Sequence, residues 1–147
     1  MFEVSPLRKL LALSARERRL LAEAALLLPA VHALQQALPY RRWRRLLTRS
    51  RASQARSAAG RPGPDELAQA VERARRGLPG AYKCLPAAYT LHLLLHRHGY
   101  GSTVTVGVAY AVGGAVEAHA WLEYQGRVLV GALPDLVRFV PLPPLEV

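Results

Sequence analysis

The residues of this chain that could do chemistry are one cysteine and one histidine, which lie in two different predicted elements. Cys84 is the only cysteine, and it opens an apolar helical segment that ends near Gly99. His119 lies downstream, within the strand-like segment 116–124. A thiol at a helix start faces the positive end of the helix dipole, which favours the thiolate. A histidine from a neighbouring strand is the usual base of such a centre, so the pair predicts cysteine-based acyl transfer.

The surroundings of His119 are polar along one side of its strand. Alternation along a strand places four side chains on one face, namely Glu117, His119, Trp121 and Glu123. A histidine between an acid and a tryptophan is unusual on a buried face. Two plain alternatives stay open: a histidine satisfied by the backbone at a sheet edge, and a cysteine that is an inert small hydrophobe.

Composition limits the class of protein. The chain has 147 residues, 51% of them hydrophobic, which fits one domain with a helical extension and argues against disorder. One cysteine excludes an intramolecular disulfide and a CxxC zinc site. No secretion signal is recognised, so a reducing cytoplasm is expected. The net charge of +10 could attract nucleic acid, anionic lipid or acidic peptide, but an arginine-rich coding bias explains it equally well.

The first predicted segment, 1–49, is helical. Ser14 and Glu17 form a capping box ahead of an apolar run from Leu20 to Leu38. Pro29 should kink or break this run, which predicts two packed helices. Trp43 follows among four arginines. A solvated helix face with the tryptophan in the core is the preferred interpretation there, with peripheral membrane contact as the alternative and nucleic acid not expected.

A linker or loop is predicted at 50–64 and the core of the protein at 65–147. The core should begin with a helix from Asp65, followed by the helix that Cys84 opens. Strands are predicted at 103–110, 116–124 and 127–130, with a two-residue turn at Gln125-Gly126 and a final edge strand and tail after Leu133. Helices followed by a small antiparallel sheet indicate an α+β fold.

Several segments resemble the transglutaminase-like B proteins of lasso-peptide biosynthesis. They are Cys84-Leu85-Pro86-Ala87-Ala88, Gly107-Val108, Ala118-His119-Ala120-Trp121-Leu122-Glu123 and Gly126-Arg127-Val128-Leu129. The resemblance implies a papain/transglutaminase-like core with a nucleophile helix and a cysteine peptidase that removes the leader of a ribosomal precursor peptide. It also implies a separate leader-recognition protein and an ATP-dependent cyclase as partners, with no cofactor.

The same resemblance assigns Cys84 as nucleophile and His119 as base. Family members often carry an acid about a dozen residues after the histidine, where this chain has Gly131. The Gln-Gly turn pairs Glu123 with Val128, which brings the chain after the third strand near His119 and predicts Asp135 as the third catalytic residue.

Three alternatives remain at this stage. An amine in place of water would make the same centre a transglutaminase. A degenerate fold would leave a non-catalytic basic binding module. His92 and His96 have a spacing that can bind zinc, but no HExxH context accompanies them, so a metal is not expected.

Overall fold

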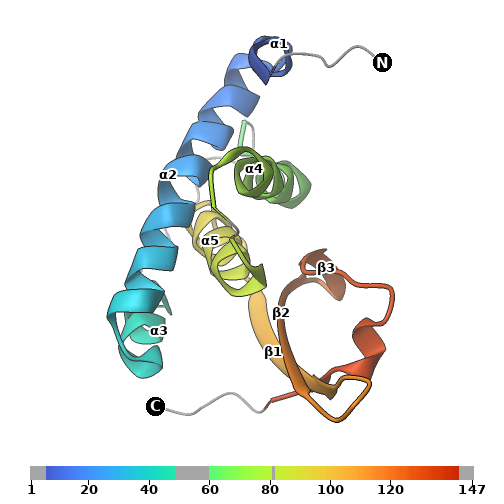
Figure 1. The fold of residues 1–147 in the computed structure, drawn as a ribbon. Helices are drawn as coiled ribbons and strands as arrows, with labels where there is room; N and C mark the ends of the chain where they lie inside the picture. The colour runs from blue at the N-terminus through green and yellow to red at the C-terminus, as the bar shows by residue number, and fades with distance from the viewer. Residues whose placement is uncertain (1–5, 49–59, 81, 143–147) are drawn as a thin grey trace, which may run out of the picture.

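The computed structural model describes residues 6–48, 60–80 and 82–142. Within these residues, five helices precede a four-stranded antiparallel sheet, which confirms the predicted α+β class (Figure 1). The helices are α1 (Pro6–Leu11), α2 (Ala15–Ala37), α3 (Tyr40–Thr48), α4 (Pro64–Gly77) and α5 (Cys84–Arg97). The strands are β1 (Thr103–Tyr110), β2 (Val116–Tyr124), β3 (Arg127–Val130) and β4 (Val140–Pro141), with a 3₁₀ turn η1 (Leu136–Arg138) before β4.

Helix α2 is one continuous helix, so the predicted break at Pro29 is wrong. The predicted capping box at its start is present: the Glu17 N–H donates to Ser14 Oγ, and the Ser14 N–H donates to the Glu17 carboxylate. Leu28 before the proline and Val31 after it are both buried on the same side of the helix. Burial of both halves against the rest of the protein outweighs the one backbone hydrogen bond that proline removes.

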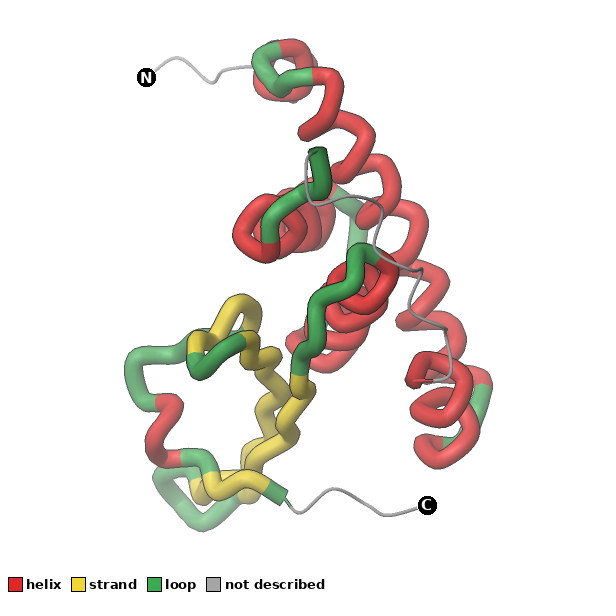
Figure 2. Tube along the Cα trace, turned by 180° about the vertical axis from the view of Figure 1, so that it is seen from behind, coloured by secondary structure: helices red, strands yellow, loops and turns green. Residues whose placement is uncertain are grey.

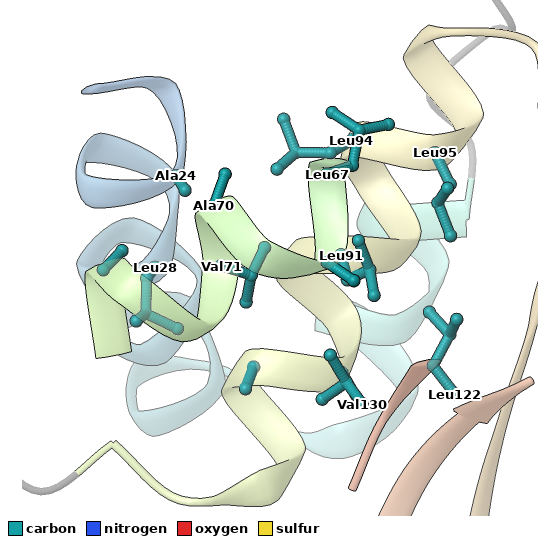
Figure 3. Close-up of a cluster of buried hydrophobic side chains, with 14 of the residues drawn as sticks. Ala24, Leu28, Leu67, Ala70, Val71, Leu91, Leu94, Leu95, Leu122 and Val130 are labelled. Atoms are coloured by element: carbon teal, nitrogen blue, oxygen red, sulfur yellow. The ribbon is translucent and has the colours of Figure 1, made fainter. Parts of the chain in front are cut away.

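Helices α2, α4 and α5 share one hydrophobic core with the sheet. Helices α4 and α5 lie between α2 and the sheet in both views of the chain (Figures 1 and 2). The fully buried side chains of this core come from α2, α4, α5 and β2. Figure 3 labels several of them, including Leu28, Val71, Leu91 and Leu122. The core therefore crosses the predicted boundary between the 1–49 and 65–147 segments; most of the predicted 50–64 linker lies outside the described residues.

Trp43 belongs to a second cluster, which fixes α3. Its ring is 3% exposed and packs edge-on against Tyr40 and Tyr89 at centroid distances of 4.9 and 4.8 Å. The predicted position of Trp43 in the core is thus confirmed. Helix α2 is long and apolar enough to span a membrane by composition alone, a test that core helices also pass.

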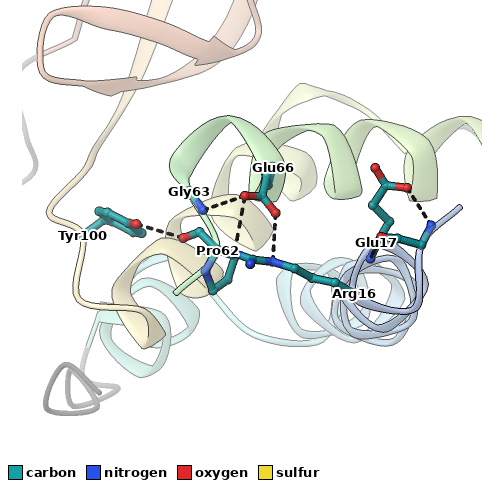
Figure 4. Close-up of polar contacts among 7 residues, drawn as sticks. Arg16, Glu17, Pro62, Gly63, Glu66 and Tyr100 are labelled. Atoms are coloured by element: carbon teal, nitrogen blue, oxygen red, sulfur yellow. Dashed lines mark hydrogen bonds and ion pairs between the residues drawn. The ribbon is translucent and has the colours of Figure 1, made fainter. Parts of the chain in front are cut away.

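The entry to α4 is held by polar contacts from two other elements (Figure 4). Arg16 of α2 forms a 3.1 Å ion pair with Glu66, which also accepts from the Gly63 N–H at the helix start. The Tyr100 hydroxyl, just beyond α5, donates to the Pro62 carbonyl at 2.8 Å. These contacts fix the position of α4 relative to both α2 and α5.

Helix α5 begins at Cys84, as predicted, and ends in a Schellman motif. The Tyr100 N–H donates to the Leu95 carbonyl and the Gly99 N–H donates to the His96 carbonyl, at 2.9 and 3.1 Å. Gly99 has a φ of +82°, which suits glycine and confirms it as the predicted C′ residue. The helix therefore has a defined length, and its first residue has a fixed place over the sheet.

The sheet has the strand order β3-β2-β1-β4. Gln125 and Gly126 both have positive φ, and the turn pairs Glu123 with Val128, as predicted from the Gln-Gly pair. One residue later the register shifts, so that Leu122 pairs with Val130 and Leu129 is the extra residue of a bulge. After β3 the chain arches away from the sheet and returns through η1 to β4, the predicted edge strand (Figure 2).

Candidate active site

Cys84 reaches the edge of β2 at the point where β3 stops covering it. The last residue pair of the β2–β3 ladder is Leu122 with Val130, so Ala120 has no partner on that strand. Its N–H donates instead to Cys84 Sγ at 3.4 Å. The thiol, which is half-buried, therefore lies against the residue next to His119. The end of a strand and the start of a helix together bring the cysteine to the histidine.

His119 is oriented by a backbone carbonyl. Its Nε2 lies 2.7 Å from the oxygen of Gly131. A carbonyl oxygen only accepts hydrogen bonds, so Nε2 must carry the proton, and the neutral ring then has its basic lone pair on Nδ1. Trp121 and Phe139 pack around the ring at centroid distances of 6.3 and 5.5 Å. The imidazole is thus held in one tautomer and one orientation.

Gly131 can come this close only because it is glycine. Its φ is +86°, a conformation that side chains disfavour. A Cβ atom added there would lie 2.5 Å from the carbonyl oxygen of Ala120 and 2.9 Å from Cα of Trp121. The residue therefore lies directly against β2, and this close approach brings its carbonyl within hydrogen-bond distance of His119.

Cys84 and His119 open onto the same cavity, whose volume is about 590 Å³. Its walls come from α4, from the start of α5, from β2, and from β3 with the chain that follows it. They comprise Glu72, Arg75, Arg76, Lys83, Cys84, Ala87, His119, Leu129, Val130, Gly131, Ala132 and Leu133. A cavity of this size accommodates several residues of an extended peptide or a small molecule.

One wall of the cavity carries a network of charged side chains. Arg75 donates from Nε to Glu72 Oε2 at 3.0 Å and from a terminal nitrogen to Glu72 Oε1, and Arg76 Nε also donates to Oε1, at 3.1 Å. The hydrogen bond from Arg75 holds the pKa of the Glu72 carboxyl below its usual value, against the opposing effect of burial. Hydrogen bonding to Glu72 raises the pKa of Arg75, and an electrostatic interaction with Cys84 adds to that rise. The guanidinium of Arg75 thus interacts electrostatically with the sulfur.

Comparison with known families places the chain in a superfamily. The model of the transglutaminase-like superfamily matches residues 10–143, which is nearly the whole chain. The chain belongs to the transglutaminase-like superfamily. This superfamily includes both cysteine peptidases and acyltransferases. Comparison with the curated proteins and with the solved structures found no match.

Of the three predicted catalytic residues, the transglutaminase-like fold brings together two. Asp135 precedes η1 and is exposed, and its carboxylate accepts from Arg138 Nε at 3.1 Å. Arg138 also binds Glu117 at 2.7 Å, and these two carboxylates raise the pKa of its guanidinium, Glu117 most strongly. The place beside the imidazole that sequence assigned to Asp135 is occupied by the Gly131 carbonyl.

The other predicted polar residues lie outside the cavity. Glu123 accepts from Trp121 Nε1 at 2.9 Å, which explains why an acid follows the tryptophan on this face. His92 lies within 2.7 Å of Ser102 and stacks on His96. Burial and, secondly, His96 lower the pKa of His92. Within residues 6–48, 60–80 and 82–142, no group of three or more histidine, cysteine or carboxylate side chains is placed to hold a metal.

Sequence reasoning missed two parts of this transglutaminase-like site. The first is Gly131, whose carbonyl lies beside His119 where a carboxylate was expected. The sequence offered a signal, because glycine at the expected acid position suggests close backbone approach. The second is the Glu72–Arg75–Arg76 network on α4, whose i,i+3 and i,i+4 spacing is also that of ordinary ion pairs on a solvated helix face.

Proposed function

We propose that this chain is a cysteine peptidase that removes the leader from a ribosomally made, lasso-type precursor peptide before macrolactam formation. The observation that carries the catalytic part is the convergence of Cys84 and His119 on one cavity, with His119 held by Gly131. The superfamily match supports acyl-transfer chemistry at a cysteine. The lasso-type substrate is supported by the sequence resemblance of the cysteine and histidine segments.

The proposed reaction begins with proton transfer from the Cys84 thiol to Nδ1 of His119. The thiolate then attacks the carbonyl carbon of the peptide bond that joins leader to core. The N–H of Cys84, at the first position of α5, is one of the helix-start N–H groups without an intrahelical partner and can donate to the tetrahedral oxyanion. The imidazolium gives its proton to the leaving amine, and water, deprotonated by His119, hydrolyses the thioester.

The partners in this proposal come from the sequence resemblance to the lasso-peptide B proteins. It implies that a separate protein holds the leader. We expect that protein to raise the cleavage rate at low precursor concentration by increasing the effective concentration of substrate. An ATP-dependent cyclase would use the released core peptide in the cytoplasm.

Two other functions use the same geometry. If an amine replaced water at the thioester, the chain would be an acyltransferase. If the thiol were unreactive, the chain would be a basic binding module. These options differ in their products: hydrolysis releases a free carboxylate, transfer gives an amide with the added amine, and a binding module leaves the peptide intact.

The test is cleavage of a precursor peptide by the purified chain with its recognition protein, followed by mass spectrometry with and without a primary amine. Wild type should release leader and core, and Cys84→Ala should release neither while its circular dichroism and unfolding midpoint stay unchanged. Cleavage by Cys84→Ala at the wild-type rate would refute the mechanism. Arg73→Gln, on the exposed side of α4, is a control that should cleave normally.

A further inference from the structure

The cavity at Cys84 has two walls of different chemistry. Arg75 and Arg76 of α4 and Lys83, the residue before Cys84, form one wall. A second part of the lining is formed by Leu129, at the bulge of β3, and by Ala132 and Leu133 after that strand. A substrate whose reacting carbonyl lies at the thiol therefore meets both cationic and aliphatic side chains.

The charged wall keeps an excess of positive charge. Glu72 is the one carboxylate among the described residues that line the cavity. Three cationic side chains line it as well, namely Arg75, Arg76 and Lys83. Arg75 binds Glu72 through two of its nitrogens, and its positive charge neutralises that carboxylate. Arg76 uses only Nε on Glu72, and its side chain is 77% exposed. Among the described residues, none accepts a hydrogen bond from the terminal nitrogens of Arg76.

We infer that this wall is a subsite for a carboxylate on the substrate, an aspartate or glutamate side chain close to the bond that is cleaved, with Arg76 as its principal ligand and Lys83 as the second. The inference rests on the proposed peptidase function and specifies its substrate. A guanidinium with two unused terminal nitrogens matches the two oxygens of a carboxylate. The side chains of Leu129, Ala132 and Leu133 carry no hydrogen-bond donor, so the side chains of the lining that match such a carboxylate are the cationic ones.

The general charge of the protein is the competing explanation, because +10 would attract any acidic peptide. Arg73 separates the two explanations. It lies on the same helix, is exposed, and does not line the cavity. Arg73→Gln and Arg76→Gln remove the same charge from α4, so a general field should weaken equally in both variants, whereas a subsite should be lost only in the second.

The first experiment compares kcat/KM for precursor peptides that carry Glu, Gln or Lys at each position next to the cut. Wild type should prefer Glu over Gln by about tenfold at one position, the lower end for a hydrogen-bonded charge pair. Arg76→Gln should reduce this preference to below about twofold, and Arg76→Glu should favour Lys. Arg73→Gln should keep the wild-type preference. Equal rates for Glu and Gln peptides, or equal losses in both glutamine variants, would overturn the inference and leave the peptidase function standing.

The second experiment needs no peptide turnover. Because Cys84 is the only cysteine, alkylation of the chain reports on this cavity alone. The ratio of the iodoacetate rate to the iodoacetamide rate compares an anionic with a neutral reagent. This ratio should exceed that of a small free thiol, fall severalfold in Arg76→Gln, and stay unchanged in Arg73→Gln. A ratio insensitive to Arg76 would refute the carboxylate subsite even if every peptide were cleaved, and a sensitive ratio without cleavage would refute only the proposed function.

Discussion

Gly131 offers the sharpest test of how the site is built. Replacing it with alanine adds one methyl group at a φ of +86°, with the new carbon 2.5 Å from the Ala120 carbonyl oxygen. That oxygen belongs to β2, which pairs with β1 through Val106 and Ala120. The clash is therefore with a backbone atom that cannot move without disturbing the sheet, and relief must come from displacement of Gly131 away from His119.

The expected magnitude has two parts. A side chain in the left-handed region costs about 1–2 kcal/mol, and overpacking against a fixed neighbour adds about 1–3 kcal/mol. Gly126 provides the matched control, because its φ is +77° and a Cβ there meets nothing within 4 Å. Gly126→Ala should thus lose about 1–2 kcal/mol of unfolding free energy, and Gly131→Ala about 2–5 kcal/mol.

Urea denaturation of wild type and both variants measures these losses. Peptide turnover is then measured under conditions where wild type and both variants are folded, which tests the effect of each substitution on catalysis. Gly131→Ala should lower turnover because His119 loses its fixed acceptor, while Gly126→Ala should cleave as wild type does. Equal destabilisation by the two substitutions would show that Gly131 is not tightly packed against β2. Full turnover in a destabilised Gly131→Ala would show that the carbonyl does not orient the imidazole.

Two further predictions concern residues that sequence singled out. Asp135→Asn should keep turnover within about twofold of wild type, because its carboxylate binds Arg138; a loss of orders of magnitude would instead support the catalytic role predicted from sequence. His92 should make stability depend on pH: burial lowers its pKa below 6.5 in the fold, so the unfolded chain binds the proton more tightly. The urea midpoint should therefore fall as pH drops below about 6.5 and stay level above it. His92→Gln should reduce this dependence of the midpoint on pH. An unchanged pH dependence in the variant would exclude His92 as its source.

The features that sequence predicted correctly depend on short stretches of chain. The capping box at Ser14, the helix start at Cys84 and its stop at Gly99 each involve a few neighbouring residues. The Gln125-Gly126 turn fixes the register of its hairpin because φ is positive at both positions. These features can be predicted from sequence because each local conformational preference is set by residues that are neighbours in the chain.

The features that sequence missed depend on packing between distant segments. Pro29 does not break α2, because Leu28 and Val31 are both buried by the rest of the fold. Asp135 was placed by continuing the hairpin register past Val128, but the bulge at Leu129 and the end of pairing at Val130 redirect the chain. Gly131 then reaches His119 first. A one-residue shift in a ladder is enough to replace a predicted carboxylate by a carbonyl.

That replacement changes where the electrostatic support of the site must come from. The Gly131 carbonyl accepts a hydrogen bond from the Nε2–H of His119, as a carboxylate would. It therefore fixes the tautomer and leaves Nδ1 as the base. It carries no net charge, however, and therefore stabilises an imidazolium less than an aspartate does. The thiol has more polar neighbours: Cys84 lies at the start of α5, the N–H of Ala120 donates to its sulfur, and Arg75 interacts with it electrostatically. A thiolate formed during the reaction would therefore be stabilised by these groups, so substitution of Arg75 should affect the reactivity of Cys84 more than substitution of any carboxylate near His119.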